Sequence, residues 1–378
     1  MTRRDKWESY LVGVINKDIG GLGAYILRGM FRALSYVYTV AVQIRVFLYN
    51  HRVLRSKSLG CMVISVGNIT VGGTGKTPVV EMLARQLINS GRRVAILSRG
   101  YKSNWDKKTH IKKPRVVSDG EKILQDVGTA GDEPYMLAKE VPEAVVLVDK
   151  NRVRAANYAI KKFNIDTVIL DDGYQYLKLE RQVNMALIDC TNPFGTHRML
   201  PRGILREPVR NLNRANIIFL TKTRGMDLYG LKKKLQHLNP KAEIVETSHK
   251  PLYVNDVYTG TRRDLKWLAG KRAVCVSGIA SPEGFEKALI DLGVMLVGCY
   301  RFSDHYTYEK EEIEQIVKDT VGKGNRSAQV LVTTQKDAVR FPKINIVREL
   351  PMCYLKVEID ILSGIKEFYD SIGAADYK

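Results

Sequence analysis

Short apolar runs alternate with stretches of helical pattern through the middle of the chain. The runs are rich in Val, Ile and Leu, whereas residues 78–90 carry apolar side chains at the three- and four-residue spacing of a helix. This alternation predicts an α/β fold in which a mostly parallel sheet has helices on both faces. The expected strands lie within residues 61–69, 92–100, 144–150, 166–173, 183–190 and 215–223.

A second α/β set follows a polar, weakly patterned stretch near residues 224–271. Its pattern predicts strands within 272–280, 294–302 and 328–334, and helices within 283–293 and 309–319. We therefore expect four parts: an N-terminal helical segment (1–54), a main α/β core (55–225), a linker or hinge (226–270) and a smaller C-terminal α/β lobe (271–378).

The N-terminal segment contains a long apolar stretch that arginines interrupt. Arg28, Arg32 and Arg45 leave no uncharged run of the roughly 20 residues that span a bilayer. The helical spacing predicts an amphipathic helix that associates with an anionic membrane surface. The alternative is a first helix that packs on the core and exposes its basic side. The polar stripe comprises Arg28, Arg32, Ser35, Thr39 and Gln43, and the apolar stripe Leu27, Phe31, Leu34, Tyr38 and Val42.

The charge balance indicates an anionic partner. The 378 residues include 60 Lys and Arg against 40 Asp and Glu, a formal net charge of +20, which suits nucleic acid, anionic lipid or a phosphorylated substrate. The composition excludes disordered and fibrous proteins. We expect no secretory signal, and we expect the five scattered cysteines to be reduced core residues of a cytosolic protein. These are Cys61, Cys190, Cys275, Cys299 and Cys353.

The strongest local motif is TVGGTGKT, which follows the first expected strand and precedes a helical pattern. Glycines let backbone N–H groups approach phosphate oxygens, Lys76 can reach the outer phosphates, and Thr77 can bind magnesium. The strict pattern has Gly where this chain has Thr70, and a glycine-rich connecting turn is the alternative. The expected nucleotide-binding residues are Thr70, Val71, Gly72, Gly73, Thr74, Gly75, Lys76 and Thr77.

Three further motifs carry candidate chemistry. Asp171 and Asp172 end an expected strand, where an acidic residue helps to hold a metal beside a phosphate loop; a turn aspartate is the alternative. Asp132 and Glu133 precede a helical pattern, which by itself indicates helix capping. His305 follows a strand of the second set, and a lone histidine is more often structural than catalytic.

Taken together and in order, the motifs of this chain resemble the tetraacyldisaccharide 4'-kinase (lipid A 4'-kinase) family of Gram-negative bacteria. The resemblance covers about residues 55–345. The motifs are SVGNITVGGTGKTP (65–78), SRGY (98–101), GDEP (131–134), LDDGYQ (170–175), LREP (205–208), SGIASPEGFE (277–286), FSDHYTY (302–308) and TTQKDAVRF (333–341).

The resemblance implies a P-loop NTPase-like kinase core that uses ATP and Mg²⁺. It implies transfer of the γ-phosphoryl group to the 4'-hydroxyl of a tetraacylated glucosamine disaccharide 1-phosphate, which gives a 1,4'-bisphosphorylated lipid A precursor. By similarity, Asp132 is the base and His305 tunes it. Lys76 and the loop amides neutralise phosphates, while Thr77 and Glu133 bind Mg²⁺ with Asp171 or Asp172.

Other implications concern the substrate and the membrane. Arg206 would hold substrate phosphate or stabilise transition-state charge, and a surface arginine is the alternative. The basic run 101–115 would meet lipid phosphates or be a solvated loop. The expected partners are the lipid substrate and the anionic leaflet at the cytoplasmic face of the inner membrane, with no nucleic acid. Tyr176, where a His is usual, and the run 194–208 depart from the family pattern.

Two other classes of protein share part of this pattern. A P-loop switch or assembly ATPase has the loop and the acidic strand end, but it gives no reason for GDEP, DHY and a membrane helix together. A nucleic-acid-binding module would suit the charge of +20. The sequence contains no recognisable nucleic-acid-binding motif.

Overall fold

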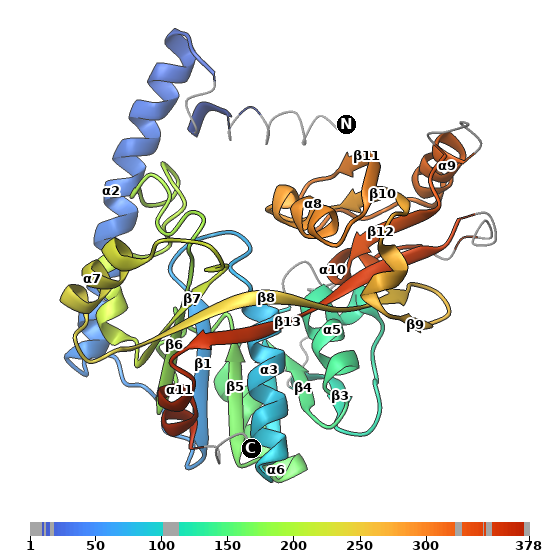
Figure 1. Cartoon of the computed structure of the whole chain (residues 1–378). Helices are drawn as coiled ribbons and strands as arrows, with labels where there is room; N and C mark the ends of the chain where they lie inside the picture. The colour runs from blue at the N-terminus through green and yellow to red at the C-terminus, as the bar shows by residue number, and fades with distance from the viewer. Residues whose placement is uncertain are drawn as a thin grey trace. The chain divides into compact units, whose positions relative to one another are not determined.

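The computed structural model describes residues 10, 13–15, 19–100, 113–321, 327–342, 344 and 350–373 (Figure 1). The chain forms two compact units, each assembled from separate stretches of sequence. The first comprises Met1–Thr74, Asp172–Glu246 and Leu362–Lys378, and the second comprises Gly75–Asp171 and Thr247–Ile361. The division into four consecutive parts stays a prediction.

The first unit is built on parallel strands in the order β1-β6-β7-β8. Strands β1, β6 and β7 are buried along nearly their whole length, as expected where both faces of a parallel sheet are covered. The elements are α2 (Leu22–Asn50), β1 (Met62–Asn68), β6 (Val183–Asp189), η1 (Val209–Arg214), β7 (Ile217–Thr221), α7 (Tyr229–Leu238), the start of β8 (Glu243–Asp256), the last residues of β13 (Met352–Ser363) and α11 (Ile365–Ile372).

One group of strands in the second unit has the order β5-β2-β4-β3, in which only β3 is antiparallel to its neighbour. The chain passes from β2 to β4 through α5 and returns from β4 to β5 through α6. Right-handed connections therefore place α5 and α6 on opposite faces. The elements are α3 (Lys76–Asn89), β2 (Val94–Ser98), β3 (Arg115–Asp119), α4 (Val127–Ala130), α5 (Asp132–Glu140), β4 (Val145–Val148), α6 (Arg152–Phe163) and β5 (Thr167–Asp171).

The other group of strands in the second unit has the order β11-β10-β12-β13-β8. Successive residues of β10 pack into two different apolar clusters: Val274 lies with residues of α9, and Cys275 lies with Leu289 of α8, because side chains alternate along a strand. The elements, besides β8 and β13, are β9 (Arg262–Arg263), η2 (Leu265–Leu268), β10 (Arg272–Ser277), α8 (Pro282–Asp291), β11 (Met295–Arg301), α9 (Lys310–Thr320), β12 (Val330–Thr334) and α10 (Gln335–Ala338).

The α/β fold with mostly parallel strands is confirmed, and each of the nine expected strands is present within its predicted range. Strands β3, β8, β9 and β13 were not predicted, and residues 226–270 contain α7, β8, β9 and η2. The expectation that every cysteine lies in the core is wrong for Cys299, which is exposed, and for Cys61, which is half-buried. Cys299 lies on β11, whose residues are alternately exposed and half-buried at the end of the strand order.

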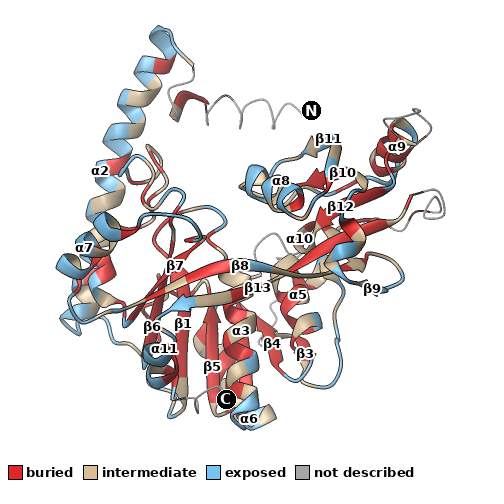
Figure 2. Cartoon of the chain, viewed as in Figure 1, coloured by how far each residue is buried: buried red, intermediate tan, exposed pale blue. Residues whose placement is uncertain are grey.

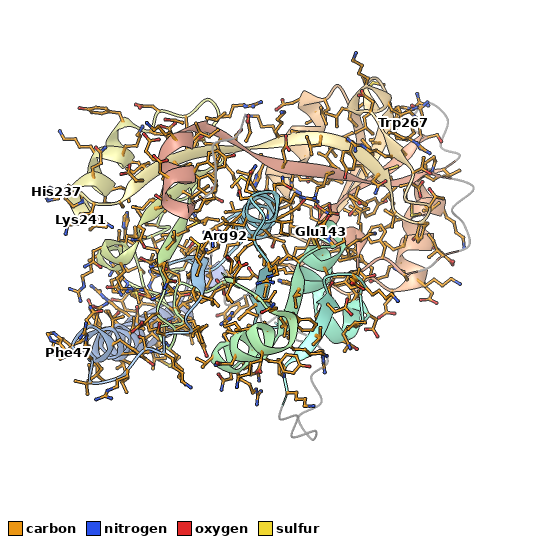
Figure 3. The ribbon with its side chains drawn as sticks, turned by 90° about the horizontal axis from the view of Figure 1, so that it is seen from below. Phe47, Arg92, Glu143, His237, Lys241 and Trp267 are labelled. Atoms are coloured by element: carbon orange, nitrogen blue, oxygen red, sulfur yellow. The ribbon has the colours of Figure 1, made fainter. Side chains whose placement is uncertain are left out.

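Helix α2 is exposed along much of its length, and its buried residues are Ala24, Ser35 and Val46 (Figure 2). Ser35 Oγ donates to the Met199 carbonyl at 2.8 Å, and Gln43 Nε2 donates to Asn211 Oδ1 at 3.1 Å. The exposed surface therefore carries many apolar side chains together with Arg32 and Arg45, and membrane association stays a prediction beside the alternative of a core-packed helix. Its exposed apolar residues include Ile26, Met30, Leu34, Val37, Val40, Ile44 and Phe47, the last of which is labelled in Figure 3.

Within the part of the chain that the structure describes, none of the helices combines the length and the apolar character that crossing a membrane requires.

A buried lysine joins four elements of the second unit. Lys356 of β13 is 3% exposed, and its Nζ donates to Glu81 of α3 at 2.8 Å and to Glu140 of α5 at 2.9 Å. It also donates to Gln335 Oε1 of α10 at 3.3 Å. Arg85 pairs with both glutamates, so the two carboxylates face two cations. Buried charges need every partner, and this cluster therefore holds α3, α5 and α10 against β13.

We expect Lys356→Met to lower the free energy of unfolding by about 3 kcal/mol, because it leaves the half-buried carboxylates of Glu81 and Glu140 with Arg85 as their remaining cation. Urea unfolding measures this loss. Lys310→Met is the control, because its ion pair with Glu314 is partly exposed on α9 and should contribute less than about 1 kcal/mol. Equal stability of the Lys356→Met protein and the parent would contradict the role of the cluster.

Candidate active site

Glycines shape the phosphate loop between β1 and α3. The backbone has φ of 111° at Gly72 and 81° at Gly75, a region that residues with side chains rarely adopt. Helix α3 begins at Lys76 with Gly75 as its N-cap. Gly75 makes no side-chain capping hydrogen bond, and the helix dipole at the start of α3 favours binding of an anion.

Hydrogen bonds within the first unit hold the start of this loop. Asn68 Nδ2 donates to Thr70 Oγ1 at 3.2 Å and to Thr74 Oγ1 at 3.0 Å. The backbone N–H of Val71 donates to the Ile204 carbonyl at 2.8 Å. The threonine at position 70, where the strict pattern has glycine, thus supplies a hydroxyl that Asn68 uses to order the loop.

Arg206 forms an ion pair with Asp172 in the first unit. Its Nη1 donates to both carboxylate oxygens, at 2.9 and 2.8 Å. The backbone N–H of Arg206 donates to the Ile69 carbonyl at 2.7 Å. Arg206 is half-buried, so the alternative of an unconstrained surface arginine is wrong. Asp172 already accepts from a guanidinium, which distinguishes it from its neighbour Asp171.

Asp171 is the last residue of β5 in the second unit, and it is buried. Its Oδ2 accepts from Ser98 Oγ at 3.2 Å, and its carbonyl accepts from Arg152 Nη2 at 2.9 Å. Strands β5 and β2 are parallel and end at Asp171 and Ser98. Both side chains therefore lie at the carboxyl edge of this strand group, where ligands of such folds bind.

The second unit brings together Asp132 and His305. Asp132 is the first residue of α5, and its Oδ2 lies 2.9 Å from His305 Nδ1, with the two side chains only 17% and 13% exposed. His305 has φ of 61°, a backbone conformation that costs energy for a residue with a side chain and that is enriched at functional sites. The Asp132 side chain binds His305, an arrangement that the capping interpretation did not anticipate.

Two basic residues near α10 complete this cluster, and the sequence analysis gave neither a role. Lys336 Nζ lies 3.0 Å from His305 Nε2 and 3.8 Å from Glu133 Oε1. Arg340, which is 6% exposed, has its Nε 3.4 Å from Asp132 Oδ2. The sequence does contain one signal for these two residues. They lie four positions apart in the motif 333–341, directly after an expected strand.

A buried carboxylate fixes the position of α10. Asp337 accepts from the Gly278 N–H at 3.1 Å, from the Tyr308 hydroxyl at 2.9 Å and from Arg340 Nη2 at 3.0 Å. Burial and the charge of Asp337 raise the pKa of Tyr308 well above its ordinary value, so this hydroxyl stays protonated and donates.

The surroundings of Asp132 favour its ionised form. Burial by itself raises the pKa of this carboxyl, but the His305 hydrogen bond and the charges of Arg340 and Lys336 outweigh burial and hold the pKa below its ordinary value. The ionised group therefore stabilises the folded unit above its unfolded pKa. This contribution is lost as pH falls through the lowered folded-state pKa.

The donors expected for magnesium come from three elements of the second unit: Thr77 from α3, Glu133 from α5 and Asp171 from β5. Among the described residues, no three His, Cys, Asp or Glu side chains gather into a preformed metal centre. Hydroxyl and carboxylate oxygens nevertheless fit Mg²⁺, which keeps several waters and commonly takes one or two carboxylates together with phosphate oxygens. Most of the basic run 101–115 lies outside the described residues.

Comparisons with known proteins agree on one family. The family model described as tetraacyldisaccharide-1-P 4'-kinase matches residues 27–373. Tetraacyldisaccharide 4'-kinase of Halothermothrix orenii is 34% identical over 355 residues, with 91% of this chain and 90% of that protein covered. The enzyme of Geobacter metallireducens is 37% identical over 315 residues, with 83% and 89% covered.

A solved structure agrees with the sequence comparisons. The crystal structure of LpxK from Aquifex aeolicus in complex with ATP superposes with a TM-score of 0.72 and 27% identity. The superposition covers 92% of this chain and 98% of the Aquifex aeolicus chain.

We expect Gly278→Ala to destabilise the protein by about 1–3 kcal/mol, because overpacking displaces buried neighbours. A Cβ at position 278 would lie 2.8 Å from the Tyr308 hydroxyl oxygen and 3.1 Å from Asp337 Oδ1. Thermal unfolding measures the effect. Gly284→Ala on α8 is the control, since its Cβ would be 3.6 Å from the nearest side chain, and a variant at Gly278 as stable as this control would contradict the tight packing.

Proposed function

We propose, for a chain that belongs to the tetraacyldisaccharide-1-P 4'-kinase family, that Asp132 accepts the proton of the sugar hydroxyl while the phosphate loop binds ATP. The chain is a tetraacyldisaccharide 4'-kinase of lipid A biosynthesis: it transfers the γ-phosphoryl group of ATP to the 4'-hydroxyl of the tetraacylated disaccharide 1-phosphate. The roles of its individual residues are the proposal.

The phosphate loop binds and neutralises the phosphates of ATP. The left-handed glycines Gly72 and Gly75 expose backbone amides, and the dipole of α3 adds positive potential at the same place. Lys76 places its ammonium on the outer phosphates. Phosphoryl transfer spreads negative charge over the phosphoryl oxygens, so positioning and neutralisation supply most of the catalysis.

Thr77, Glu133 and Asp171 are the residues that we assign to Mg²⁺. A bound Mg²⁺ supplies further neutralisation of the developing phosphate charge. Asp171 suits this position better than Asp172, because Asp172 receives two hydrogen bonds from Arg206. Lys336 lies near Glu133, so the charge of that carboxylate is partly balanced before any metal binds.

The Asp132–His305 hydrogen bond of 2.9 Å is the observation that carries the assignment of the base. Asp132 keeps its carboxylate ionised through hydrogen bonding and nearby cations. When the 4'-oxygen attacks the γ-phosphorus and the bond to ADP breaks, the hydroxyl proton passes to Asp132 Oδ1 or Oδ2. His305 holds the carboxylate in place and shares its charge through Nδ1.

Arg206 orders the acidic strand end in this proposal. Its two hydrogen bonds to Asp172 fix the segment that follows β5. Since bidentate arginine also recognises phosphate, the 1-phosphate or the transferred group of the lipid is a second acceptor for its remaining N–H groups.

Helix α2 provides the membrane contact at the cytoplasmic face of the inner membrane. A substrate with four acyl chains resides in a leaflet, and the enzyme must dock at that leaflet to reach the head group. The exposed apolar residues of α2 supply the area to bury. Residues 1–57 carry ten Lys and Arg against three Asp and Glu, which attracts anionic lipid.

The decisive experiment measures transfer of labelled γ-phosphate from Mg-ATP to the tetraacyl disaccharide 1-phosphate in mixed micelles. We expect Asp132→Asn to lower kcat by about 10²–10⁴-fold, the usual contribution of a general base, with an ATP dissociation constant within about threefold of the parent. Lys76→Ala should lose ATP binding. Asp291→Asn, an exposed change at the end of α8, is the control.

Near-normal turnover of Asp132→Asn would remove Asp132 as the base. ATP hydrolysis without labelled lipid would instead favour a switch ATPase.

We expect Val37→Glu combined with Ile44→Glu to reduce flotation with anionic liposomes by more than about tenfold, because two exposed apolar side chains lose their burial energy in the membrane. ATP binding should not change. Ile290→Glu is the control, since Ile290 is also exposed and apolar but lies on α8. Unchanged flotation of the α2 variant would rule out this helix as the membrane contact.

A further inference from the structure

Lys336 approaches the histidine of the site from the side opposite Asp132. Its Nζ lies 3.0 Å from His305 Nε2, while Asp132 Oδ2 lies 2.9 Å from Nδ1 of the same ring. Both ring nitrogens of His305 are therefore within hydrogen-bond distance of a charged group. The two groups have opposite hydrogen-bonding character.

This arrangement favours one form of the imidazole ring, since the ammonium is nearer to Nε2 than the Asp304 carboxylate, whose Oδ2 lies 4.0 Å away. A lysine ammonium has three donors and no acceptor, so Nε2 must accept and carry no proton. An ionised carboxylate has only acceptors, so Nδ1 must carry the proton and donate to Asp132. The other neutral tautomer would place a proton between Nε2 and the ammonium and a lone pair against the carboxylate. A charged ring would also direct a proton at the ammonium.

Hydrogen bonds from Arg340 to the backbone hold the segments that carry Lys336 and His305. Arg340 donates from Nε to the Lys336 carbonyl at 3.1 Å and from Nη1 to the Tyr306 carbonyl at 2.8 Å. Tyr306 in turn donates its hydroxyl to Glu312 Oε1 at 2.6 Å. The strained φ of 61° at His305 is thus supported from both sides of the residue.

Two carboxylates hold the ammonium of Lys336 in place. Asp304 Oδ1 lies 3.1 Å from Nζ, and Glu133 Oε1 lies 3.8 Å from it. The Lys336 side chain is 21% exposed, so its charge is partly withdrawn from water and depends on these partners. Asp304 and Glu133 therefore hold the Lys336 ammonium near His305.

We propose that Lys336 is a positioning residue for phosphoryl transfer: by donating to His305 Nε2 it keeps this nitrogen unprotonated, so that a neutral ring donates only from Nδ1 to Asp132. This inference rests on the proposed roles of Asp132 and His305. Lys336 itself touches none of the reacting atoms in this assignment. Its effect passes through the orientation and the proton location of the imidazole ring.

The test reads the tautomer directly, by ¹⁵N NMR of the full chain labelled at its six histidines, with His305→Gln used to assign the signal. We expect the parent and Lys336→Arg to show the Nδ1–H form, because both side chains only donate. Lys336→Met should show a larger fraction of the ring protonated on both nitrogens, because no cation then opposes a proton on Nε2 while Asp132 still accepts from Nδ1. Lys310→Met, which removes a lysine from α9, should leave the His305 signal unchanged.

Kinetics in the lipid assay provide the second readout. Lys336→Met should lower kcat by about tenfold to a hundredfold, part of the full contribution of the base, with KM for ATP within about threefold, and Lys336→Arg should restore most of kcat. Should Lys336→Met fail to fold, Lys336→Gln replaces it, because an amide presents either a donor or an acceptor and no longer imposes one tautomer.

An Nε2 that stays unprotonated in Lys336→Met to the same extent as in the parent, with or without a loss of kcat, would overturn the inference. The tautomer is measured without substrate, so it decides the Lys336–His305 assignment by itself. Absence of lipid phosphorylation by the parent protein would instead refute the proposed function alone.

Discussion

The architecture of the second unit depends on one buried ammonium group. Lys356 belongs to β13, yet its nitrogen is shared by carboxylates of α3 and α5 and by an amide of α10. Those helices begin at Lys76, at Asp132 and one residue before Lys336. Because a buried charge tolerates no missing partner, the positions of these helices are coupled: a shift in one withdraws a ligand from the lysine that holds the others.

The fold could be predicted where strands are buried on both faces, because such strands appear in the sequence as continuous apolar runs. The runs 61–69 and 183–190 correspond directly to β1 and β6. Strand β13 could not be recognised in this way, because Lys356 interrupts its apolar pattern and a lysine ordinarily indicates an exposed position. Only the tertiary structure supplies the two glutamates that allow this lysine to be buried. Strand β8 was missed because its exposure is mixed along its length.

Some residues of the candidate site likewise could not be recognised from the local sequence pattern alone. The phosphate loop is a local motif, so the sequence was sufficient to find Lys76 and Thr77. Asp132 and His305 lie 173 residues apart, and each has an ordinary structural explanation when considered alone. The resemblance to the family implied that His305 tunes Asp132, and the structure places the two side chains in contact. Lys336 and Arg340 had no distinguishing local pattern, since their importance arises from the imidazole and the carboxylate that they meet in space.

The late position of β13 also affects how the enzyme is made. A nascent chain that has emerged as far as β7 already contains the phosphate loop and Asp132, whereas His305, Lys336 and Lys356 have not been synthesised. At bacterial elongation rates this interval lasts on the order of tens of seconds. During it, Glu81 and Glu140 have no buried ammonium to bind. A polypeptide released before β13 therefore carries the phosphate loop and Asp132 on helices that lack their shared ammonium, and the second unit gains this support only after nearly the whole chain has been made.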